Sequence, residues 1–322
     1  MESTLQKWGL QCSLQKWILL FGAVTTVLTM FVYKDYITNV AYIPRISSSI
    51  PSDIFHELIN ALDKFSAPPP NDTEVKVHLF DVRLSPLEKQ RFFTLLDMAH
   101  NVTSRHNLTY FLVFGTLLGS YRHHDIVPWD DDMDIYVSFR DKEKFRNAYK
   151  NITDHVYYPT GKYSAKLSLS YGRRYDTKRG GDVFNLGYEY TYPFLDVFYY
   201  KDNTTHLTGP QQKKPLRLSV IFPLQLRPMN QKLYFAPRDP YRYLKELDYG
   251  LDECFTGGYN HSIELRKRRE ETATLPCANL VNKVPFVTHV RGPGGAFCLE
   301  HLTSQGKVLS SFSRSKRGIP EC

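Results

Sequence analysis

The sequence predicts a mixed α/β domain, a central sheet flanked by helices, preceded by an N-terminal transmembrane helix. Strand-like and helical segments follow one another without the regular βαβ alternation that is typical of a parallel sheet. Aromatic residues make up 14% of the 322 residues, which favours a packed core and extended strands over disorder. A long uncharged apolar run near the N-terminus is the third observation.

The apolar run, residues 17–33, reads WILLFGAVTTVLTMFVY and has the length of a short membrane span. Lys7 and Lys16 precede it, and basic residues concentrate on the cytosolic side of such helices. We therefore expect a single-pass type II protein of the Golgi or ER membrane, with a cytosolic tail at 1–16 and the catalytic domain in the lumen. A cleaved signal peptide is the alternative, although no good cleavage site follows the run.

Glycosylation sequons and cysteines support a lumenal location. Chance predicts about two Asn-x-Ser/Thr triplets in such a chain. Six occur, headed by Asn71, Asn101, Asn107, Asn151, Asn203 and Asn260. Four cysteines lie in the C-terminal third, at Cys254, Cys277, Cys298 and Cys322. They favour disulfides over a zinc site because no Cys-x-x-Cys pair occurs, and three pairings remain possible.

The net charge of +8 suits an anionic membrane face or a phosphate-bearing substrate, or it reflects scattered solubilising side chains. No segment reads as a known nucleic-acid-binding module, so we expect no nucleic-acid partner.

Local patterns predict the order of elements. Residues 34–78 read as a lumenal stem with a Pro-rich stretch, and residues 79–290 as the catalytic domain. The residues from Ser85 to Glu88 form a capping box that starts a helix over 86–105. We expect strands over 110–114, 133–137, 165–171, 183–190, 194–200, 220–226 and 232–235, and helices over 139–150 and over 239–248, the latter ended by Gly250. The basic tail, 291–322, is expected to be flexible.

The segment 115–137 carries the candidate chemistry. Four aspartates occupy five positions, at Asp130, Asp131, Asp132 and Asp134. Unpaired carboxylates so close repel one another unless a cation or water surrounds them. Because side chains alternate along a strand, Asp132 and Asp134 point together to the face opposite Met133 and Ile135. Such a pair can chelate Mg²⁺ (or Mn²⁺). The alternative is an acidic turn at a strand edge, but such turns rarely lead straight into an apolar strand.

A second feature lies upstream of these aspartates. Gly119 and Ser120 predict a turn at the start of a helix, where backbone N–H groups can approach phosphate oxygens. Arg122 and His123 follow and can neutralise a diphosphate. A Gly-Ser turn, about ten residues and then Asp-x-Asp on a strand together form the signature of the nucleotidyltransferase fold.

The run GTLLGSYRHHDIVPWDDDMDI resembles the signature of the LicD family, which includes bacterial phosphocholine transferases and animal fukutin and fukutin-related protein. A second similar block contains Phe222-Pro223, Arg238-Asp-Pro240, Tyr243-Leu244 and Tyr249-Gly250. The resemblance covers about residues 85–250 and fades beyond them, including at GGYNH. It implies a nucleotidyltransferase-like fold, a divalent metal, and transfer of a phosphoalcohol such as phosphocholine or ribitol phosphate from a CDP-linked donor.

The resemblance also assigns roles to residues. Asp132 and Asp134 match the family's metal aspartates, and Arg122 and His123 match its Arg-His pair. A third carboxylate is expected on a neighbouring strand, and Asp196 is the best candidate, as a metal ligand that also acts as a base. An edge-strand charge is the alternative for it.

Two further residues complete the predicted site. Asp130 is the second candidate base, and Lys166 is expected to steady the donor phosphates unless it is only a solvated strand lysine. We expect the acceptor to be a glycan on a protein or lipid in the same lumen. The rival functions are an Asp-x-Asp sugar-nucleotide glycosyltransferase and a catalytically silent glycan-binding protein.

Overall fold

The computed structural model describes residues 76–150, 152–173, 176–179, 182–185, 188–295 and 297–315. The expected cytosolic tail and signal-anchor lie outside these residues, as does nearly all of the stem. Within the described ranges, no helix combines the length and the apolar character that a membrane crossing needs.

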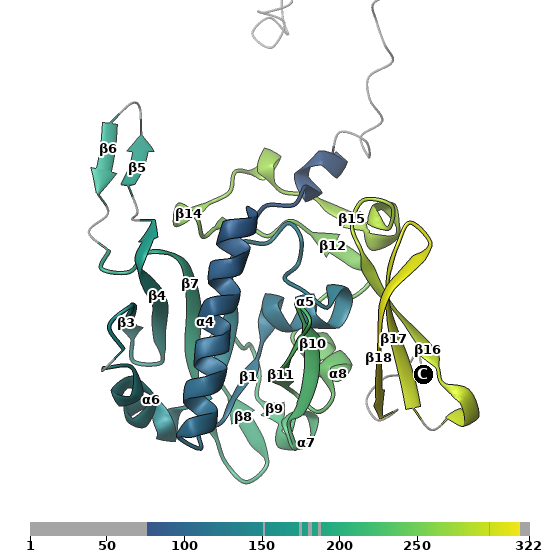
Figure 1. Ribbon diagram of the computed structural model, residues 1–322, viewed down its shortest axis with the longest axis horizontal. Coiled ribbons are helices and arrows are strands. Elements are labelled where there is room, and N and C mark those ends of the chain that lie inside the picture. The colour runs from purple at the N-terminus through teal and green to yellow at the C-terminus, as the bar shows by residue number, and fades with distance from the viewer. Residues whose placement is uncertain are drawn as a thin grey trace, which may run out of the picture. The chain divides into compact units, whose positions relative to one another are not determined.

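The capping box starts the long helix α4 (Pro86–Arg105), as the sequence predicts. The Ser85 hydroxyl accepts a hydrogen bond from the Glu88 N–H at 3.3 Å, and the Glu88 carboxylate accepts one from the Ser85 N–H at 3.0 Å. These two bonds satisfy backbone donors that the first helical turn leaves unpaired. The apolar face of α4 is buried, and the helix packs against the central sheet (Figure 1).

The central sheet is mixed, as predicted. Its main path is β1–β2–β7–β4–β3, and β7 also pairs with β8, which pairs with β9. The strands are β1 (Tyr110–Leu112), β2 (Asp134–Ser138), β3 (His155–Gly161), β4 (Ser164–Arg173), β7 (Tyr192–Asp202), β8 (His206–Thr208) and β9 (Leu216–Arg217). Among the described strands, β2 and β7 alone run parallel, and they lie side by side in the sheet. A 3-10 turn, η4 (Phe139–Asp141), and helix α6 (Lys142–Tyr149) follow β2, close to the predicted helix.

A second group of elements packs beside this sheet. It contains α5 (Phe114–His123), α7 (Leu218–Ile221), β10 (Gln225–Met229), β11 (Lys232–Ala236) and α8 (Pro240–Glu246). The prediction of a strand over 220–226 is wrong. Val220 and Ile221 are buried residues of the single helical turn α7, and strand β10 begins only at Gln225. The periodicity of a short apolar run does not distinguish a helix from a strand.

Two other boundaries differ from expectation. Helix α8 ends before Asp248, whose φ of 64° reverses the chain two residues before Gly250. The strand predicted over 183–190 is wrong at its end, because residues 188–190 are not a strand. Strand β6 (Asp182–Asn185) forms, and it pairs with β5 (Asp176–Arg179) in a hairpin that projects from the sheet (Figure 1).

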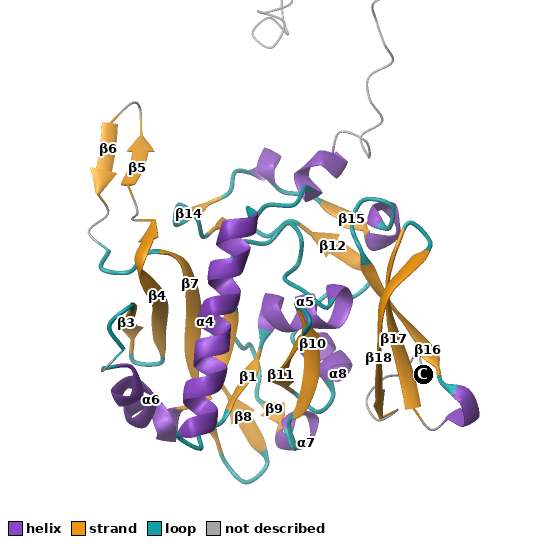
Figure 2. Cartoon of the chain, in the orientation of Figure 1, coloured by secondary structure: helices purple, strands orange, loops and turns teal. Residues whose placement is uncertain are grey.

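The C-terminal third is built mainly of strands and loops (Figure 2). It holds β12 (Glu253–Phe255), β13 (Tyr259–Asn260), β14 (Leu265–Arg266), β15 (Thr274–Pro276), β16 (Phe286–Arg291), β17 (Phe297–Ser304) and β18 (Lys307–Ser315). Short 3-10 turns are η3 (His78–Phe80), η5 (Arg269–Glu271), η6 (Cys277–Leu280) and η7 (Pro293–Gly295). A disulfide joins Cys254 to Cys277, which confirms disulfide use for this pair.

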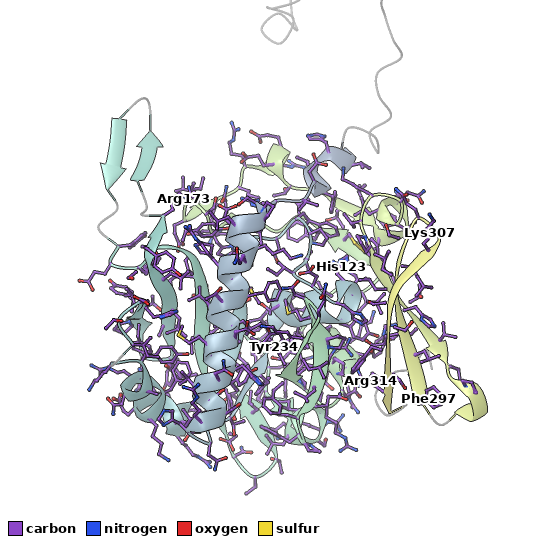
Figure 3. All side chains as sticks on the ribbon, viewed as in Figure 1. His123, Arg173, Tyr234, Phe297, Lys307 and Arg314 are labelled. Carbon is purple, nitrogen blue, oxygen red and sulfur yellow. A yellow bond between two sulfur atoms is a disulfide. The ribbon has the colours of Figure 1, made fainter. Side chains whose placement is uncertain are left out.

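The expectation of a flexible tail from residue 291 is wrong for the described part of that segment. Strands β16, β17 and β18 form an antiparallel sheet anchored by the fully buried Glu300. Arg227 donates two hydrogen bonds of 2.8 Å to its carboxylate, and His124 lies 2.9 Å away. Arg314 on β18, which Figure 3 labels, lies 3.5 Å away. This long-range ion pairing holds the segment in place despite its polar composition.

Candidate active site

The predicted carboxylates meet at the two central parallel strands. In the register between β2 and β7, Asp134 lies directly beside Asp196, and Asp132 lies two residues before Asp134, the first residue of β2. One carboxylate oxygen from each of these three residues lies within 4.8 Å of the others. Met133 and Ile135 are fully buried on the opposite face, as the strand alternation predicts.

The electrostatics of this cluster favour a bound cation. Burial raises the pKa of Asp132 well above its ordinary value, and the charge of Asp134 raises it further. Burial and the neighbouring Asp196 act on the pKa of Asp134 in the same direction. The pKa of Asp196 is also raised by burial, although Lys166 opposes that shift. Three buried carboxylate oxygens form a hard donor set of the kind that Mg²⁺ or Mn²⁺ binds, with room for water and substrate oxygens.

Lys166 lies on β4 directly opposite Asp196 in the strand register. Its ammonium donates to both Asp196 oxygens, at 3.0 and 3.2 Å, and lies 3.4 Å from Glu264. Lys166 therefore holds the third carboxylate rather than a donor phosphate in this arrangement. Glu264 also accepts hydrogen bonds from the hydroxyls of Tyr190 and Tyr259, so it ties β4 to the β13–β14 hairpin.

Asp130 and Asp131 have different surroundings. Asp130 lines the cavity beside Asp132, and burial together with the Asp132 charge raises its pKa well above the ordinary value. A Cβ on Gly115 would lie 2.9 Å from the Asp130 carboxylate, so a larger residue at this position in α5 would shift that carboxylate. Asp131 is buried behind the site, where its carboxylate pairs with Arg83 at 3.0 Å and accepts the Ser262 N–H at 3.2 Å.

His261 is a site residue that the sequence analysis missed. Its Nδ1 lies 3.1 Å from Asp131 and its Nε2 lies 3.4 Å from Asp132, so the ring bridges the Asp131 carboxylate and the cluster of Asp132, Asp134 and Asp196. Burial raises the pKa of Asp131, but the hydrogen bond from His261 and the charge of Arg83 lower it overall. In the sequence, His261 is the last residue of the segment GGYNH, which lies outside the family resemblance and about 130 residues from the aspartates.

Arg122 lines the cavity as predicted, but His123 does not. Arg122 is buried over the Trp129 ring, and burial lowers its pKa to about 10, so it remains protonated at neutral pH. Its Nε donates to Nε2 of His123 at 3.1 Å, while Nδ1 of His123 donates to the Pro285 carbonyl at 2.7 Å. Burial and Arg122 lower the pKa of His123 well below its ordinary value. His123, which Figure 3 labels, is buried and therefore positions Arg122 from the protein interior.

The predicted phosphate-binding turn at Gly119 and Ser120 is wrong. Helix α5 begins at Phe114, so both residues lie in its middle, and both are buried. A Cβ on Gly119 would collide with the Asp125 carbonyl and approach the Val127 N–H to 2.9 Å. The Ser120 hydroxyl donates to the Pro228 carbonyl at 2.9 Å. These residues pack α5 against its neighbours and do not face the cavity.

A cavity of about 680 Å³ opens over the carboxylates. Its walls come from α5, the start of β2, the middle of β7, the residues that follow α8, and the segment from β12 to β13. The described arrangement therefore places the cluster of Asp132, Asp134 and Asp196 and the buried Arg122 around a space large enough for a nucleotide-sized ligand.

Comparisons with known proteins agree with this geometry. The family described as LicD/FKTN/FKRP, nucleotidyltransferase domain, matches residues 107–239. The chain is 26% identical over 132 residues to the lipopolysaccharide cholinephosphotransferase LicD of Haemophilus influenzae, which covers 40% of this chain and 49% of that protein. It is also 26% identical over 132 residues to the ribitol-5-phosphate transferase FKTN of Homo sapiens. That match covers 40% of this chain and 25% of that protein.

An uncharacterised protein of Rickettsia typhi is 33% identical over 76 residues, or 24% of this chain and 23% of that protein. The chain thus matches about half or less of the length of each of these relatives. The matched segment contains the two strands that bring Asp132, Asp134 and Asp196 together. Residues 107–239 therefore match a LicD/FKTN/FKRP nucleotidyltransferase domain, and the relatives are distant homologues over that segment.

Proposed function

We propose that this protein is a metal-dependent phosphotransferase that moves a phosphoalcohol, phosphocholine or ribitol phosphate in type, from a CDP-linked donor to a glycan acceptor in the secretory pathway. The cluster of Asp132, Asp134 and Asp196 in a cavity of a LicD-family domain is the observation that carries the proposal. The similarity to a cholinephosphotransferase and to a ribitol-5-phosphate transferase supports the class of group transferred.

The three carboxylates would hold Mg²⁺ or Mn²⁺, which supplies charge stabilisation for the donor phosphates and the leaving nucleotide. Arg122, protonated in the cavity wall, shares that negative charge. The acceptor hydroxyl oxygen forms a bond to the phosphorus that carries the alcohol, and the bond from this phosphorus to the bridging oxygen breaks as CMP leaves. Asp130 takes the hydroxyl proton, because it faces the cavity while Asp196 is engaged by Lys166.

Two observations support the lumenal compartment. The disulfide between Cys254 and Cys277 is of a kind that persists in oxidising compartments. Three of the sequon asparagines, Asn101, Asn107 and Asn203, are exposed on the described surface and accessible to glycosylation. The single N-terminal anchor and the Golgi or ER location belong to the proposal. Glycosidase treatment should shift the mobility of the full-length protein, and alkaline carbonate should leave it in the membrane. Release by carbonate would contradict the anchor.

The activity is tested with the full-length protein in detergent. We expect Mg²⁺- or Mn²⁺-dependent release of CMP from CDP-choline or CDP-ribitol in the presence of a glycan acceptor, with the product identified by mass spectrometry. Asp132→Asn should abolish release, whereas Asp154→Asn, which changes an exposed carboxylate outside the site, should not. Turnover of UDP- or GDP-sugars in place of CDP-alcohols would instead indicate a glycosyltransferase. Metal binding without turnover of any donor would indicate a silent binding protein.

A further inference from the structure

One wall of the cavity is a small two-stranded sheet that the proposed reaction chemistry does not use. Strands β12 and β15 pair antiparallel, and Phe255 lies directly opposite Thr274 in their register. Glu253, Phe255 and Thr274 are exposed and line the cavity, whereas Cys254 and Leu275 between them are buried. Because side chains alternate along a strand, the three exposed residues share one face of this sheet. We call Glu253, Phe255 and Thr274 the open face.

The strand that carries the open face is attached to the wall of the cavity through its backbone. The Trp129 indole N–H donates to the Phe255 carbonyl at 2.9 Å, and Nη1 of Arg122 donates to the Glu253 carbonyl at 3.4 Å. A disulfide joins the buried side of the same strand to the segment that follows β15. These contacts use the backbone and the buried face, so they fix the strand without occupying the side chains of Glu253 and Phe255.

The segment after β12 continues along the cavity to the carboxylate cluster. It begins beside Arg122 and reaches His261, whose Nε2 lies 3.4 Å from Asp132. Gly257 and Gly258 lie between them and line the cavity, and a Cβ on Gly258 would meet nothing within 4 Å. This stretch without side chains leaves room for a bulky ligand between the open face and the cluster.

The side chains of the open face are available for a ligand. The Phe255 ring is 53% exposed, and within the described ranges no aromatic ring stacks on it. In the same part of the chain, no side chain forms an ion pair or a hydrogen bond with the Glu253 carboxylate. Single apolar side chains are common on protein surfaces. Phe255, however, lines a cavity together with a carboxylate and a hydroxyl, which is the mixture that specific pockets use.

We propose that the open face binds a neutral sugar ring of the acceptor, with Phe255 stacked on the C–H face of the sugar and with Glu253 and Thr274 bonded to its hydroxyls. The inference rests on the proposed transfer to a glycan. The face of an aromatic ring carries partial negative charge and attracts polarised C–H groups. A carboxylate accepts hydrogen bonds through two oxygens, so Glu253 suits two neighbouring hydroxyls. Its charge opposes a uronic acid or a phosphorylated sugar.

The openness of the site favours an acceptor over the alcohol of the donor. A glycan attached to a protein or lipid needs a site that opens to solvent, and Phe255 is more than half exposed. A quaternary ammonium such as choline is bound by a cage of several aromatic rings. The open face presents one ring, which suits the flat side of a sugar.

Binding to the full-length protein in detergent tests this without turnover. Saturation-transfer NMR in Mg²⁺ and CDP would compare the methyl glycosides of glucose, galactose, mannose, xylose and N-acetylglucosamine with methyl uronides and choline. At least one neutral glycoside should bind, and a uronide of the same configuration should bind at least tenfold more weakly. Phe255→Ala should weaken the neutral glycoside about tenfold, whereas Phe255→Trp should retain it. Glu253→Gln should weaken it about three- to tenfold and reduce the discrimination against the uronide.

Tyr171→Ala is the matched control, because Tyr171 on β4 is 60% exposed and does not line the cavity. It should leave all affinities unchanged, and neither Phe255→Ala nor Glu253→Gln should change CDP affinity in a calorimetric titration.

Four results would overturn the inference. If CDP binds in Mg²⁺ but no neutral glycoside binds, or if Phe255→Ala leaves glycoside binding unchanged, the open face is not an acceptor site and the proposed function stands. Choline binding that is lost in Phe255→Ala would place the alcohol of the donor on this face instead. Failure of CDP to bind in Mg²⁺ would overturn the proposed function and the inference with it.

Discussion

The carboxylate cluster should destabilise the protein when no cation is bound, and Asp134→Asn tests this most directly. The substitution keeps the side-chain shape and removes one charge from the centre of the cluster. Two unit charges 4.8 Å apart repel by about 3.5 kcal/mol at an effective dielectric constant of about 20. Asp134 has two such neighbours, Asp132 and Asp196, and Lys166 offsets part of the repulsion at Asp196.

The net repulsion on Asp134 is therefore about that of one pair of charges. Removing it in Asp134→Asn should raise the free energy of unfolding in EDTA by about 3 kcal/mol. For a domain of this size, each kcal/mol shifts Tm by about 2–4 °C. The variant should therefore melt at least about 6 °C above the wild-type protein when both are metal-free. Differential scanning fluorimetry and chemical denaturation in EDTA measure the two quantities.

Added Mg²⁺ should close most of this difference in stability. A ligand present at a hundred times its Kd stabilises the protein it binds by about 2.7 kcal/mol, so Tm of the wild-type protein should rise and that of Asp134→Asn should stay fixed. Asp154→Asn, an exposed carboxylate, should behave like wild type under both conditions. A metal-free Asp134→Asn protein that melts at or below the wild-type temperature would refute the view that these carboxylates are held together against their repulsion.

Three other predictions follow from the contacts. Arg122→Ala should weaken CDP binding about ten- to a hundredfold in a calorimetric titration, and unchanged affinity would remove Arg122 from the donor site. Gly119→Ala should lower the free energy of unfolding by about 1–3 kcal/mol in a urea melt, because its Cβ meets backbone that cannot rotate away; wild-type stability would disprove that packing. Burial raises the pKa of Glu300, but the charge of Arg227 outweighs burial and lowers this pKa overall. The ion pairing of Glu300 therefore stabilises the protein at pH values above about 4.3, the ordinary glutamate pKa, and this stabilisation is lost as the pH falls below that value. Glu300→Gln should cost about 3–5 kcal/mol at neutral pH and flatten the acid side of the stability profile, and an unchanged profile would contradict this.

The site divides into residues that local sequence predicts and residues that it does not. Asp132 and Asp134 were predictable because the alternation of a strand puts them on one face, whatever the rest of the fold does. Asp196 was predictable as a lone acid in an aromatic strand, but its place beside Asp134 depends on the pairing of β7 with β2. His261 reaches the cluster from about 130 residues away, and no local pattern reports such a contact.

Three errors share one cause. The Gly119-Ser120 pair has the composition of a phosphate-binding turn, but α5 begins five residues earlier and buries both. The segment after residue 291 has the composition of a flexible tail, but Glu300 is buried against Arg227. The run around Val220 has the composition of a strand but forms one helical turn. Composition reports local preference, and in each case distant packing outweighed it.

The sequence alone determined the long helix from its capping box at Ser85, the mixed strand and helix order, and the paired aspartates that identify the chemistry. These depend on contacts within a few residues, which a linear pattern records. Tertiary structure decided the parallel register that adds Asp196, the Cys254–Cys277 pairing, and the approach of His261 and Phe255 to the cavity. Those features depend on which segments distant in the sequence pack against one another, and that packing is determined by the hydrophobic core as a whole.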